Sequence, residues 1–306
     1  MTRRSSETYA ACRQNVNVVE STRRKENTIR AEVVSIPTDT IELDGLLYEP
    51  TDQPAIGCVQ LFHGNGMNFY VGPPRFLPER LVNLGFACLA YNRRGHDILS
   101  TRNSRMAEGN AFQTAAQAVA DNRYAAQWLA TRGYDNPVVV GHSNGGMLAV
   151  RHVTDHPQTP ALVLMSAHRG GRRMVEIASQ KGLLACDKLD AVTERAHLLI
   201  DTGRGAELML LPGWWYVTTA SSWVDLLNNT PDILELAPEI RCPTLYVRGD
   251  QEPADLYPAE EFQARSGGCV DVLILDGCDH FYNGVEGSTA DAVGDWLASI
   301  VNRRTS

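Results

Sequence analysis

Short apolar runs alternate along the chain with segments whose apolar residues recur at helical spacing. The opening segments 31–39 (AEVVSIPTD) and 41–50 (IELDGLLYEP) are typical of a strand pair with a turn between them. Six later runs are almost continuously apolar: 55–62, 86–91, 137–142, 161–165, 243–249 and 270–275. Such runs indicate strands that are buried on both faces of a sheet. The pattern therefore predicts eight strands.

Helical segments separate most of these strands. Apolar residues at helical spacing predict helices within 76–85, 111–131, 146–156, 258–267 and 289–302. Strands that alternate with helices favour a mostly parallel sheet with helices on both faces, and the opening pair adds an antiparallel edge. The expected fold is therefore α/β, built on a mostly parallel eight-stranded sheet.

The same alternation divides the chain into four parts. Residues 1–30 are polar and without pattern, so we expect an N-terminal arm. Residues 31–169 and 241–306 carry the alternation and form the two parts of one core domain. Between them, residues 170–240 contain helical pieces and proline breaks but no convincing strand, which predicts a helical insertion.

Composition and charge narrow the range of partners. The chain has 306 residues, of which 43% are hydrophobic and 21% charged, as in ordinary globular proteins. Its net charge of −8 repels phosphate backbones, so nucleic acid is not an expected partner. No run approaches the roughly 18 apolar residues that a membrane span needs, and no segment resembles a secretory signal. We expect a small-molecule substrate, and a homodimer is left open.

Cysteine usage and metal motifs bear on location and cofactors. Seven cysteines are scattered along the chain, none of them in a C-x-x-C pair. Such a set favours buried free thiols in a reducing cytoplasm. The chain contains neither H-E-x-x-H nor G-x-G-x-x-G, so we expect no metal and no dinucleotide cofactor.

The sharpest chemical signal is the segment GHSNGG at 141–146, which lies between the apolar run VVV and a predicted helix. A serine on such a tight strand-to-helix turn is typical of an exposed nucleophile. Gly141 and Gly145 leave room for the strand and the helix to approach each other. The alternative is a strand-ending turn in which Ser143 only caps the helix. We expect Ser143 to be the nucleophile.

A serine nucleophile needs a base, and the base needs an acid to orient it. His280 directly follows the last predicted strand. Because the carboxyl ends of parallel strands share one edge of a sheet, His280 can meet Ser143 there. We therefore expect His280 to be the base. Four other histidines at strand ends compete with it: His63, His96, His142 and His168.

The acid is expected at the end of the strand that precedes the base. The segment GDQEP at 249–253 supplies two carboxylates, and Asp255 follows shortly after. We expect Glu252 to be the acid, with Asp250 and Asp255 as alternatives. The acid can also follow the strand that comes directly after the nucleophile. Here that strand is followed by SAHRGGRR, and the first carboxylate beyond it is Glu176, so this alternative is disfavoured.

Two backbone amides are candidates for an oxyanion hole. The N–H of Asn144 lies at the start of a predicted helix, where the helix dipole favours negative charge. The second candidate is Asn65 in the segment HGNG at 63–66, because a glycine on either side lets its amide face inward. The alternative for this segment is a plain glycine turn.

The segments HGNG, GHSNGG, GDQEP and GCDHF together resemble the α/β-hydrolase superfamily, in its serine esterase-, lipase- and peptidase-like branch. The resemblance covers nearly all of the chain from residue 31, and the order Ser…acid…His matches. It implies the α/β-hydrolase fold with a helical cap, here residues 170–240. The family usually has G-D-x-D-P near the acid, whereas this chain has Glu252. The run NRRGH at 92–96 resembles a motif that buttresses active-site loops.

The insertion carries adjacent aromatic residues that suit a substrate pocket: Trp214, Trp215 and Tyr216. They either line an apolar acyl or alcohol pocket above the serine or pack the cap onto the core domain. A basic cluster lies at the same sheet edge: Arg169, Arg172 and Arg173. This cluster can hold a substrate carboxylate, but a solvated loop is the favoured interpretation.

These expectations lead to one function and its alternatives. The sequence predicts a serine hydrolase that cleaves a carboxylic ester through an acyl-enzyme, with Ser143, His280 and Glu252 as its triad. The same machinery can act on an amide, a lactone or a carbon–carbon bond, or transfer the acyl group. A non-catalytic ligand-binding protein on the same fold is the remaining alternative. Dehalogenase and epoxide hydrolase chemistry is disfavoured, because it needs a carboxylate nucleophile.

Overall fold

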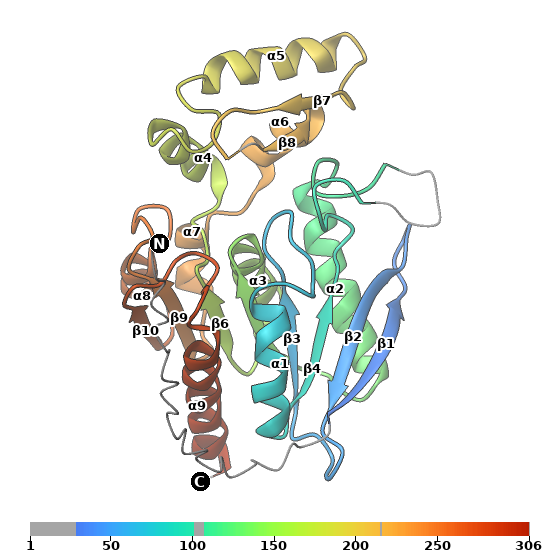
Figure 1. The fold of residues 1–306 in the computed structure, drawn as a ribbon, viewed down its shortest axis with the longest axis vertical. Coiled ribbons are helices and arrows are strands. Elements are labelled where there is room, and N and C mark those ends of the chain that lie inside the picture. Colours follow the sequence, from blue (N-terminus) through green and yellow to red (C-terminus); the bar gives the residue numbers. More distant parts are fainter. Residues whose placement is uncertain (1–28, 101–106, 215, 306) are drawn as a thin grey trace, which may run out of the picture.

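An eight-stranded β-sheet forms the centre of the computed structural model, which describes residues 29–100, 107–214 and 216–305 (Figure 1). Its strands are β1 (Arg30–Ile36), β2 (Leu43–Glu49), β3 (Cys58–Phe62), β4 (Ala87–Tyr91), β5 (Val138–His142), β6 (Leu162–Met165), β9 (Thr244–Gly249) and β10 (Val270–Leu275). The six apolar runs of the sequence all lie in this sheet, and the five residues of β3, β4 and β5 are buried throughout. The predicted N-terminal arm lies outside the described residues except at its end.

The strand order is β1-β2-β4-β3-β5-β6-β9-β10. The pairs β1–β2 and β2–β4 are antiparallel, and every other neighbouring pair is parallel. The predicted mostly parallel eight-stranded sheet with an antiparallel edge is therefore confirmed. Because β3, β5, β6, β9 and β10 run in the same direction, the loops that follow them meet at one edge of the sheet.

Helices cover both faces of the sheet (Figure 1). They are α1 (Pro73–Asn83), α2 (Ala115–Thr131), α3 (Asn144–Asp155), α7 (Ile233–Leu236), α8 (Ala259–Arg265) and α9 (Glu286–Thr305), with the 3₁₀ helix η1 (Ala237–Glu239). One face is covered by α1 and α9, which pack against each other, and the other by α2, α3, α7 and α8. Local sequence sets some of the ends: Thr114 and Gln117 form a capping box at the start of α2.

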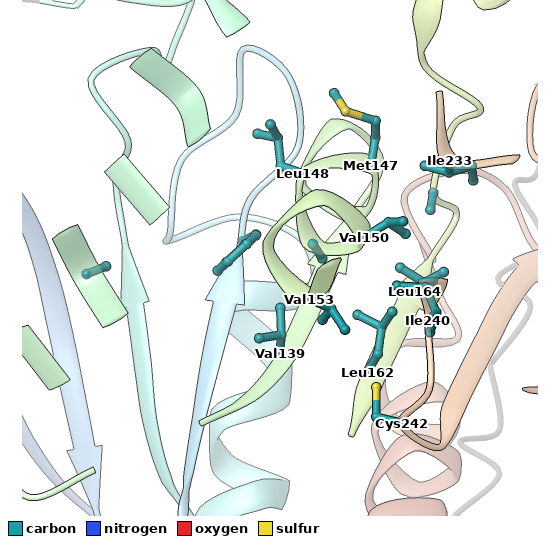
Figure 2. Packing of buried hydrophobic residues seen from close by; sticks show 14 of the residues in the cluster. Val139, Met147, Leu148, Val150, Val153, Leu162, Leu164, Ile233, Ile240 and Cys242 are labelled. Atoms are coloured by element: carbon teal, nitrogen blue, oxygen red, sulfur yellow. The ribbon is translucent and has the colours of Figure 1, made fainter. Parts of the chain in front are cut away.

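The core under α3 shows how the sheet and the helices hold together (Figure 2). Val150 and Val153 of α3 lie beside Leu162 and Leu164 of β6, and Ile233 and Ile240 of the segment around α7 complete this cluster. The labelled residues are Val139, Met147, Leu148, Val150, Val153, Leu162, Leu164, Ile233, Ile240 and Cys242. Full burial of each such aliphatic side chain contributes roughly 1.5–3 kcal/mol relative to exposure. This packing fixes the start of α3, where the candidate nucleophile lies.

The insertion between β6 and β9 extends beyond the carboxyl ends of the strands (Figure 1). It contains α4 (Gly171–Gln180), α5 (Leu189–Asp201), β7 (Leu208–Leu210), β8 (Val217–Thr219) and α6 (Ala220–Asn229). These elements share their own apolar core around the fully buried Trp223. The expectation of an insertion without strands is wrong, because β7 and β8 pair in an antiparallel ribbon. Each of these strands has only three residues, too few to produce a visible alternation.

The two ends of the insertion lie side by side. Gly170 pairs with Asp232 in an isolated antiparallel bridge, and the Ile233 N–H donates to the Arg169 carbonyl at 2.8 Å. Beyond this point Ile233, Leu234, Ala237 and Ile240 pack in the core under the sheet rather than in the insertion. The packing thus places the end of the insertion several residues before the expected position 240. Among the described residues, no helix is long and apolar enough to cross a membrane.

Candidate active site

Ser143 lies on a strained turn between β5 and α3. Its backbone has φ 56° and ψ −118°, a region that residues with a side chain rarely adopt. Close packing on either side explains the glycines of the motif. A Cβ on Gly145 would lie 2.3 Å from the carbonyl oxygen of Phe62, and one on Gly141 would lie 2.3 Å from that of Gly145. The structure thus has the tight strand-to-helix turn that the sequence motif predicts.

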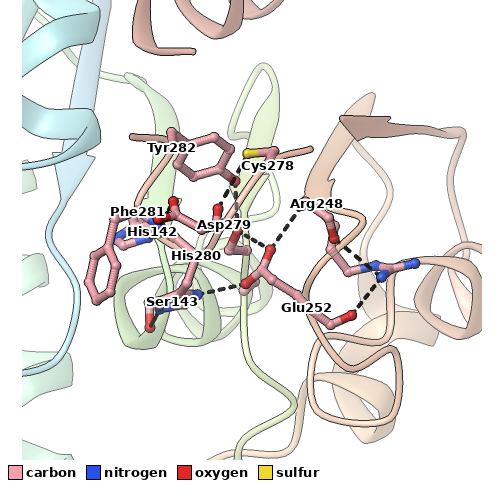
Figure 3. Close-up of polar contacts among 12 residues, drawn as sticks. His142, Ser143, Arg248, Glu252, Cys278, Asp279, His280, Phe281 and Tyr282 are labelled. Carbon is pink, nitrogen blue, oxygen red and sulfur yellow. Dashed lines mark hydrogen bonds and ion pairs between the residues drawn. The ribbon is translucent and has the colours of Figure 1, made fainter. Parts of the chain in front are cut away.

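His280 connects Ser143 to Glu252, as Figure 3 shows. Its Nε2 lies 3.0 Å from Ser143 Oγ, and its Nδ1 lies 2.6 Å from Glu252 Oε1. When the imidazole is neutral, Nδ1–H donates to the carboxylate and Nε2 accepts from the serine hydroxyl. The three residues follow β5, β9 and β10, so the common direction of these strands brings together groups up to 137 positions apart in the chain.

Glu252 is buried and held by several donors. Only 6% of the residue is exposed. Its Oε2 accepts hydrogen bonds from Ser166 Oγ at 2.6 Å and from the Gly249 N–H at 2.9 Å. The Tyr282 hydroxyl lies 2.8 Å from Ser166 Oγ and extends this network. These donors satisfy the buried carboxylate oxygen and fix the direction of the side chain toward His280.

The two alternative acids are engaged elsewhere. Asp250 is exposed and accepts from the Cys278 N–H at 3.2 Å, which ties together the loops that follow β9 and β10. Asp255 is exposed and pairs with Lys181 Nζ at 3.1 Å. Glu176, the first carboxylate after β6, pairs with Arg173 at 3.1 Å. Of the carboxylates considered from the sequence, the structure brings Glu252 to His280.

His142 lies beneath His280 and supports its backbone. Its Nε2 donates to the His280 carbonyl oxygen at 2.9 Å, and the centroids of the two rings are 4.9 Å apart. Burial and the neighbouring imidazole of His280 lower the pKa of His142 to about 3. A neutral His142 therefore acts as a fixed support for the loop that carries His280.

The loop at 63–66 is held by two buried side chains, His63 and Arg93. His63 Nδ1–H donates to the Gly64 carbonyl at 2.8 Å, and its Nε2 accepts from the Arg93 N–H at 3.0 Å. The Arg93 guanidinium donates to the His63 carbonyl at 2.9 Å and to Asn144 Oδ1 at 3.3 Å. Burial lowers the pKa of Arg93 to about 10, which leaves it charged at neutral pH. The loop and the start of α3 are thus linked by one buried cation.

Both predicted oxyanion residues lie beside this serine. Asn144 is the first residue of α3, so its N–H has no acceptor within the helix. A Cβ on Gly64 would lie 3.3 Å from Ser143 Cβ, so the loop that carries Asn65 passes directly against the serine. Asn65, Asn144 and His280 line the same cavity. The position of both amides next to the serine suits the binding of a negatively charged oxygen.

A cavity of about 470 Å³ lies between the insertion and the sheet edge. Its walls are mainly apolar and include Trp214, Tyr216, Tyr257 and Phe281. The structure thus places two of the three predicted aromatic residues in a pocket, while Trp215 lies outside the described residues. Such a volume suits a ring-sized or medium-length apolar group.

The basic cluster does not reach this cavity. Arg169 pairs with Asp232 at 2.9 Å, and Arg172 donates to Asn228 at 3.1 Å. The third member, Arg173, is exposed and pairs with Glu176. None of the three lines the cavity in the part of the chain that the structure describes. The expected loop is wrong for Arg172 and Arg173, which lie in the first turn of α4, and the contacts of all three residues do not suit a site for a substrate carboxylate.

Several residues of the site could not be found from the sequence. Ser166 contacts the carboxylate that orients the histidine, yet a single serine after an apolar run carries no motif. The one signal for Ser166 was its position directly after β6, where an alternative acid was considered from the sequence. Tyr282 likewise acts through contacts between distant segments. Arg93, by contrast, lies in the run NRRGH at 92–96, and its contacts with His63 and Asn144 agree with the buttressing role that the sequence indicated.

The sheet order, the strained serine turn and the neighbouring histidine and carboxylate define the class as that of the α/β-hydrolase fold. The chain belongs to the alpha/beta hydrolase family, whose model matches residues 61–295. The resemblance inferred from the sequence motifs is therefore confirmed.

Solved structures agree with this fold. The chain is similar to Est1E from Butyrivibrio proteoclasticus with bound ferulic acid, at 17% identity and a TM-score of 0.68, over 88% of this chain and 99% of that one. It is also similar to the esterase Pf2001 from Pyrococcus furiosus, at 14% identity and a TM-score of 0.60, over 90% and 91% of the two chains. A dienelactone hydrolase from Anabaena variabilis matches at 17% identity and a TM-score of 0.55, over 88% and 97%. At these identities, the likeness concerns the fold.

Proposed function

We propose that the protein is a serine hydrolase that cleaves carboxylic esters. The observation that carries the proposal is the unbroken chain of contacts from Glu252 through His280 to the Ser143 hydroxyl, with distances of 2.6 and 3.0 Å. A nucleophile, a base within hydrogen-bond reach and an acid that orients the base are the groups that acyl transfer needs.

The reaction proceeds through two tetrahedral intermediates. The Ser143 oxygen attacks the ester carbonyl while His280 Nε2 accepts the hydroxyl proton. The carbon–oxygen bond of the alcohol then breaks, and His280 returns the proton to the leaving alkoxide, which leaves an acyl-enzyme. Water next attacks the acyl carbon with His280 again as base. The acid product departs, and the serine regains its proton.

Glu252 stabilises the imidazolium that forms in each half of the reaction. The carboxylate is fixed by its hydrogen bonds from Ser166 and Gly249, so it holds the Nδ1–H tautomer of His280 without moving. The amides of Asn65 and Asn144 donate to the oxyanion of both intermediates. Loss of one such donor typically costs about 3 kcal/mol of transition-state stabilisation.

The insertion serves as the cap, and the cavity beneath it selects the substrate. Its mainly apolar walls favour an uncharged ester, and Trp214 and Tyr216 contact the substrate from the cap side. Fold relatives that are described as esterases, and Est1E with its bound ferulic acid, support ester cleavage as the proposed activity. In the described part of the chain, the cysteines are free thiols. This supports a location in the reducing cytoplasm.

The decisive test labels the nucleophile. We expect a fluorophosphonate probe to label the wild-type protein and p-nitrophenyl esters to be hydrolysed, with both signals lost in Ser143→Ala. Labelling that survives this substitution would remove Ser143 from the mechanism. A wild-type protein that neither reacts with the probe nor turns over any ester would indicate a ligand-binding protein on this fold.

A matched pair of carboxylate variants tests the acid. Glu252→Gln keeps the shape of the side chain but removes the charge that stabilises the imidazolium, so kcat/KM is expected to fall by about 10²–10⁴-fold. The exposed Asp250→Asn is the control and is expected to stay within about threefold of wild type. Equal losses in the two variants would contradict the assignment of Glu252.

A further inference from the structure

His168 lines the cavity, and no other described residue forms a hydrogen bond with its ring. It follows β6 two residues after Ser166, and only 9% of it is exposed. Its Nδ1 is enclosed, its ring interacts with its own backbone alone, and its Nε2 makes no hydrogen bond to another residue within the described ranges. Buried polar side chains are nearly always paired, so a ring nitrogen without a partner in a cavity wall indicates a partner that comes from outside the protein.

The surroundings keep this imidazole neutral. Burial and the nearby imidazole of His280 lower the pKa of His168 to about 4. A neutral imidazole offers one N–H donor and one acceptor nitrogen. It therefore suits a neutral polar group, whereas a buried carboxylate would need a cation beside it.

Most of the other residues that line the cavity are apolar. Met174, Leu184 and Leu256 surround the cavity with aliphatic side chains, together with the aromatic residues already described. The Tyr216 hydroxyl, another polar group of the wall, already accepts a hydrogen bond from Asn110 Nδ2 at 3.1 Å. His168 thus offers an uncommitted hydrogen-bonding nitrogen in mainly apolar surroundings.

We propose that His168 determines specificity by forming a hydrogen bond to a hydroxyl group on the part of the ester that fills the cavity. The proposal rests on the proposed esterase function and adds a substrate class, namely esters of an apolar, ring-sized acid or alcohol that carries a hydroxyl. A hydroxyl both donates and accepts, so it pairs with Nε2 in either tautomer of the imidazole. The aromatic walls provide the contact area for the ring.

The test uses two pairs of substrates that differ by one hydroxyl. The acyl pair is methyl 3-phenylpropanoate and methyl 3-(4-hydroxyphenyl)propanoate, and the alcohol pair is 2-phenylethyl acetate and 2-(4-hydroxyphenyl)ethyl acetate. In at least one pair we expect the wild-type enzyme to prefer the hydroxylated ester in kcat/KM by about tenfold, the effect of one buried hydrogen bond. His168→Phe is expected to bring this ratio to about one, because the hydroxylated ester loses its hydrogen bond.

Two further variants serve as controls. His168→Gln keeps a side chain that can donate and accept, so part of the preference is expected to return. His197→Phe changes an exposed histidine on α5 and is expected to leave the ratio as in the wild type. A ratio near one for both pairs in the wild type, or a preference that persists in His168→Phe, would overturn the proposal.

A binding measurement separates this proposal from ester hydrolysis itself. In Ser143→Ala, calorimetric titration compares the two alcohols, 2-(4-hydroxyphenyl)ethanol and 2-phenylethanol, and the two methyl esters of the acyl pair. In at least one of these pairs the hydroxylated compound is expected to bind about tenfold more tightly. The difference is expected to vanish when His168→Phe is added. Equal binding within both pairs refutes the role of His168, whether or not the protein hydrolyses esters. Absence of ester turnover with a retained difference in binding refutes only the hydrolase function.

Discussion

Buried neutral histidines are expected to make this protein sensitive to mild acid, and His152 offers a test away from the active site. His152 lies on α3 and is 5% exposed. Its ring is edge-on to Phe62, with centroids 5.6 Å apart, and stacks on His156 at 4.1 Å. Burial, with a smaller contribution from the charge of His156, lowers its pKa from 6.5 to about 3.

The direction and size of the effect follow from proton linkage. The folded protein keeps His152 neutral well below pH 6.5, whereas the unfolded chain protonates it there. His152 therefore does not reduce the free energy of unfolding above about pH 6.5, and it reduces it progressively as the pH drops toward 3. Between pH 7.5 and 5.5 this one residue removes slightly more than about 1 kcal/mol. His142 and His168, with pKa values of about 3 and 4, act in the same direction. Together the three remove about 4 kcal/mol from a stability that is typically 5–15 kcal/mol.

The variant His152→Gln replaces the imidazole with a neutral polar side chain that does not titrate. Urea unfolding is followed by tryptophan fluorescence at pH 7.5 and at pH 5.5. Between these two pH values the free energy of unfolding of the variant is expected to fall by about 1 kcal/mol less than that of the wild type. The exposed His197→Gln is the matched control and is expected to lose as much as the wild type. If His152→Gln and the wild type lose the same free energy, then His152 is not held neutral in the folded protein.

Two other substitutions test the geometry around the serine. In Gly146→Ala the new Cβ would lie 2.4 Å from Ala167 Cβ, so α3 must move from β6. The urea midpoint is expected to reveal a loss of about 1–3 kcal/mol, and an unchanged midpoint would contradict this close contact. Ser166→Ala removes a donor to the Glu252 carboxylate, and steady-state kinetics are expected to show kcat about tenfold lower with KM unchanged. A change confined to KM would instead indicate a contact between Ser166 and the substrate.

The parts of the fold that could be predicted from the sequence are those with a strong local signal. Fully apolar runs such as VVV at 138–140 identify central strands, because only a sheet covered on both faces buries every residue. Glycines on both sides of Ser143 predict the tight turn, since the packing around it excludes a Cβ. The candidates Ser143, Glu252 and His280 could be identified from the sequence because each of them follows a predicted strand.

The parts that could not be predicted depend on contacts between distant segments. The strands β7 and β8 have three residues each, and their pairing with each other holds them in place rather than any apolar alternation. Ser166, which donates a hydrogen bond to Glu252, is 86 positions away from it in the chain and has no motif around it. The placement of Trp214 and Tyr216 in the cavity wall likewise depends on how the insertion folds on itself, which no local pattern encodes.

The bridge between Gly170 and Asp232 gives the insertion a narrow stem. The chain leaves the core and returns to it at nearly the same point, where the Arg169–Asp232 ion pair of 2.9 Å fastens the two crossings. The spacing of β6 and β9 therefore does not set the length of the polypeptide beyond this stem. Leu256 and Tyr257, which follow β9, also pack against the insertion. We expect a cap of another shape, grafted at the stem, to change the cavity while the β6–β9 pairing is retained, provided that it covers these two side chains.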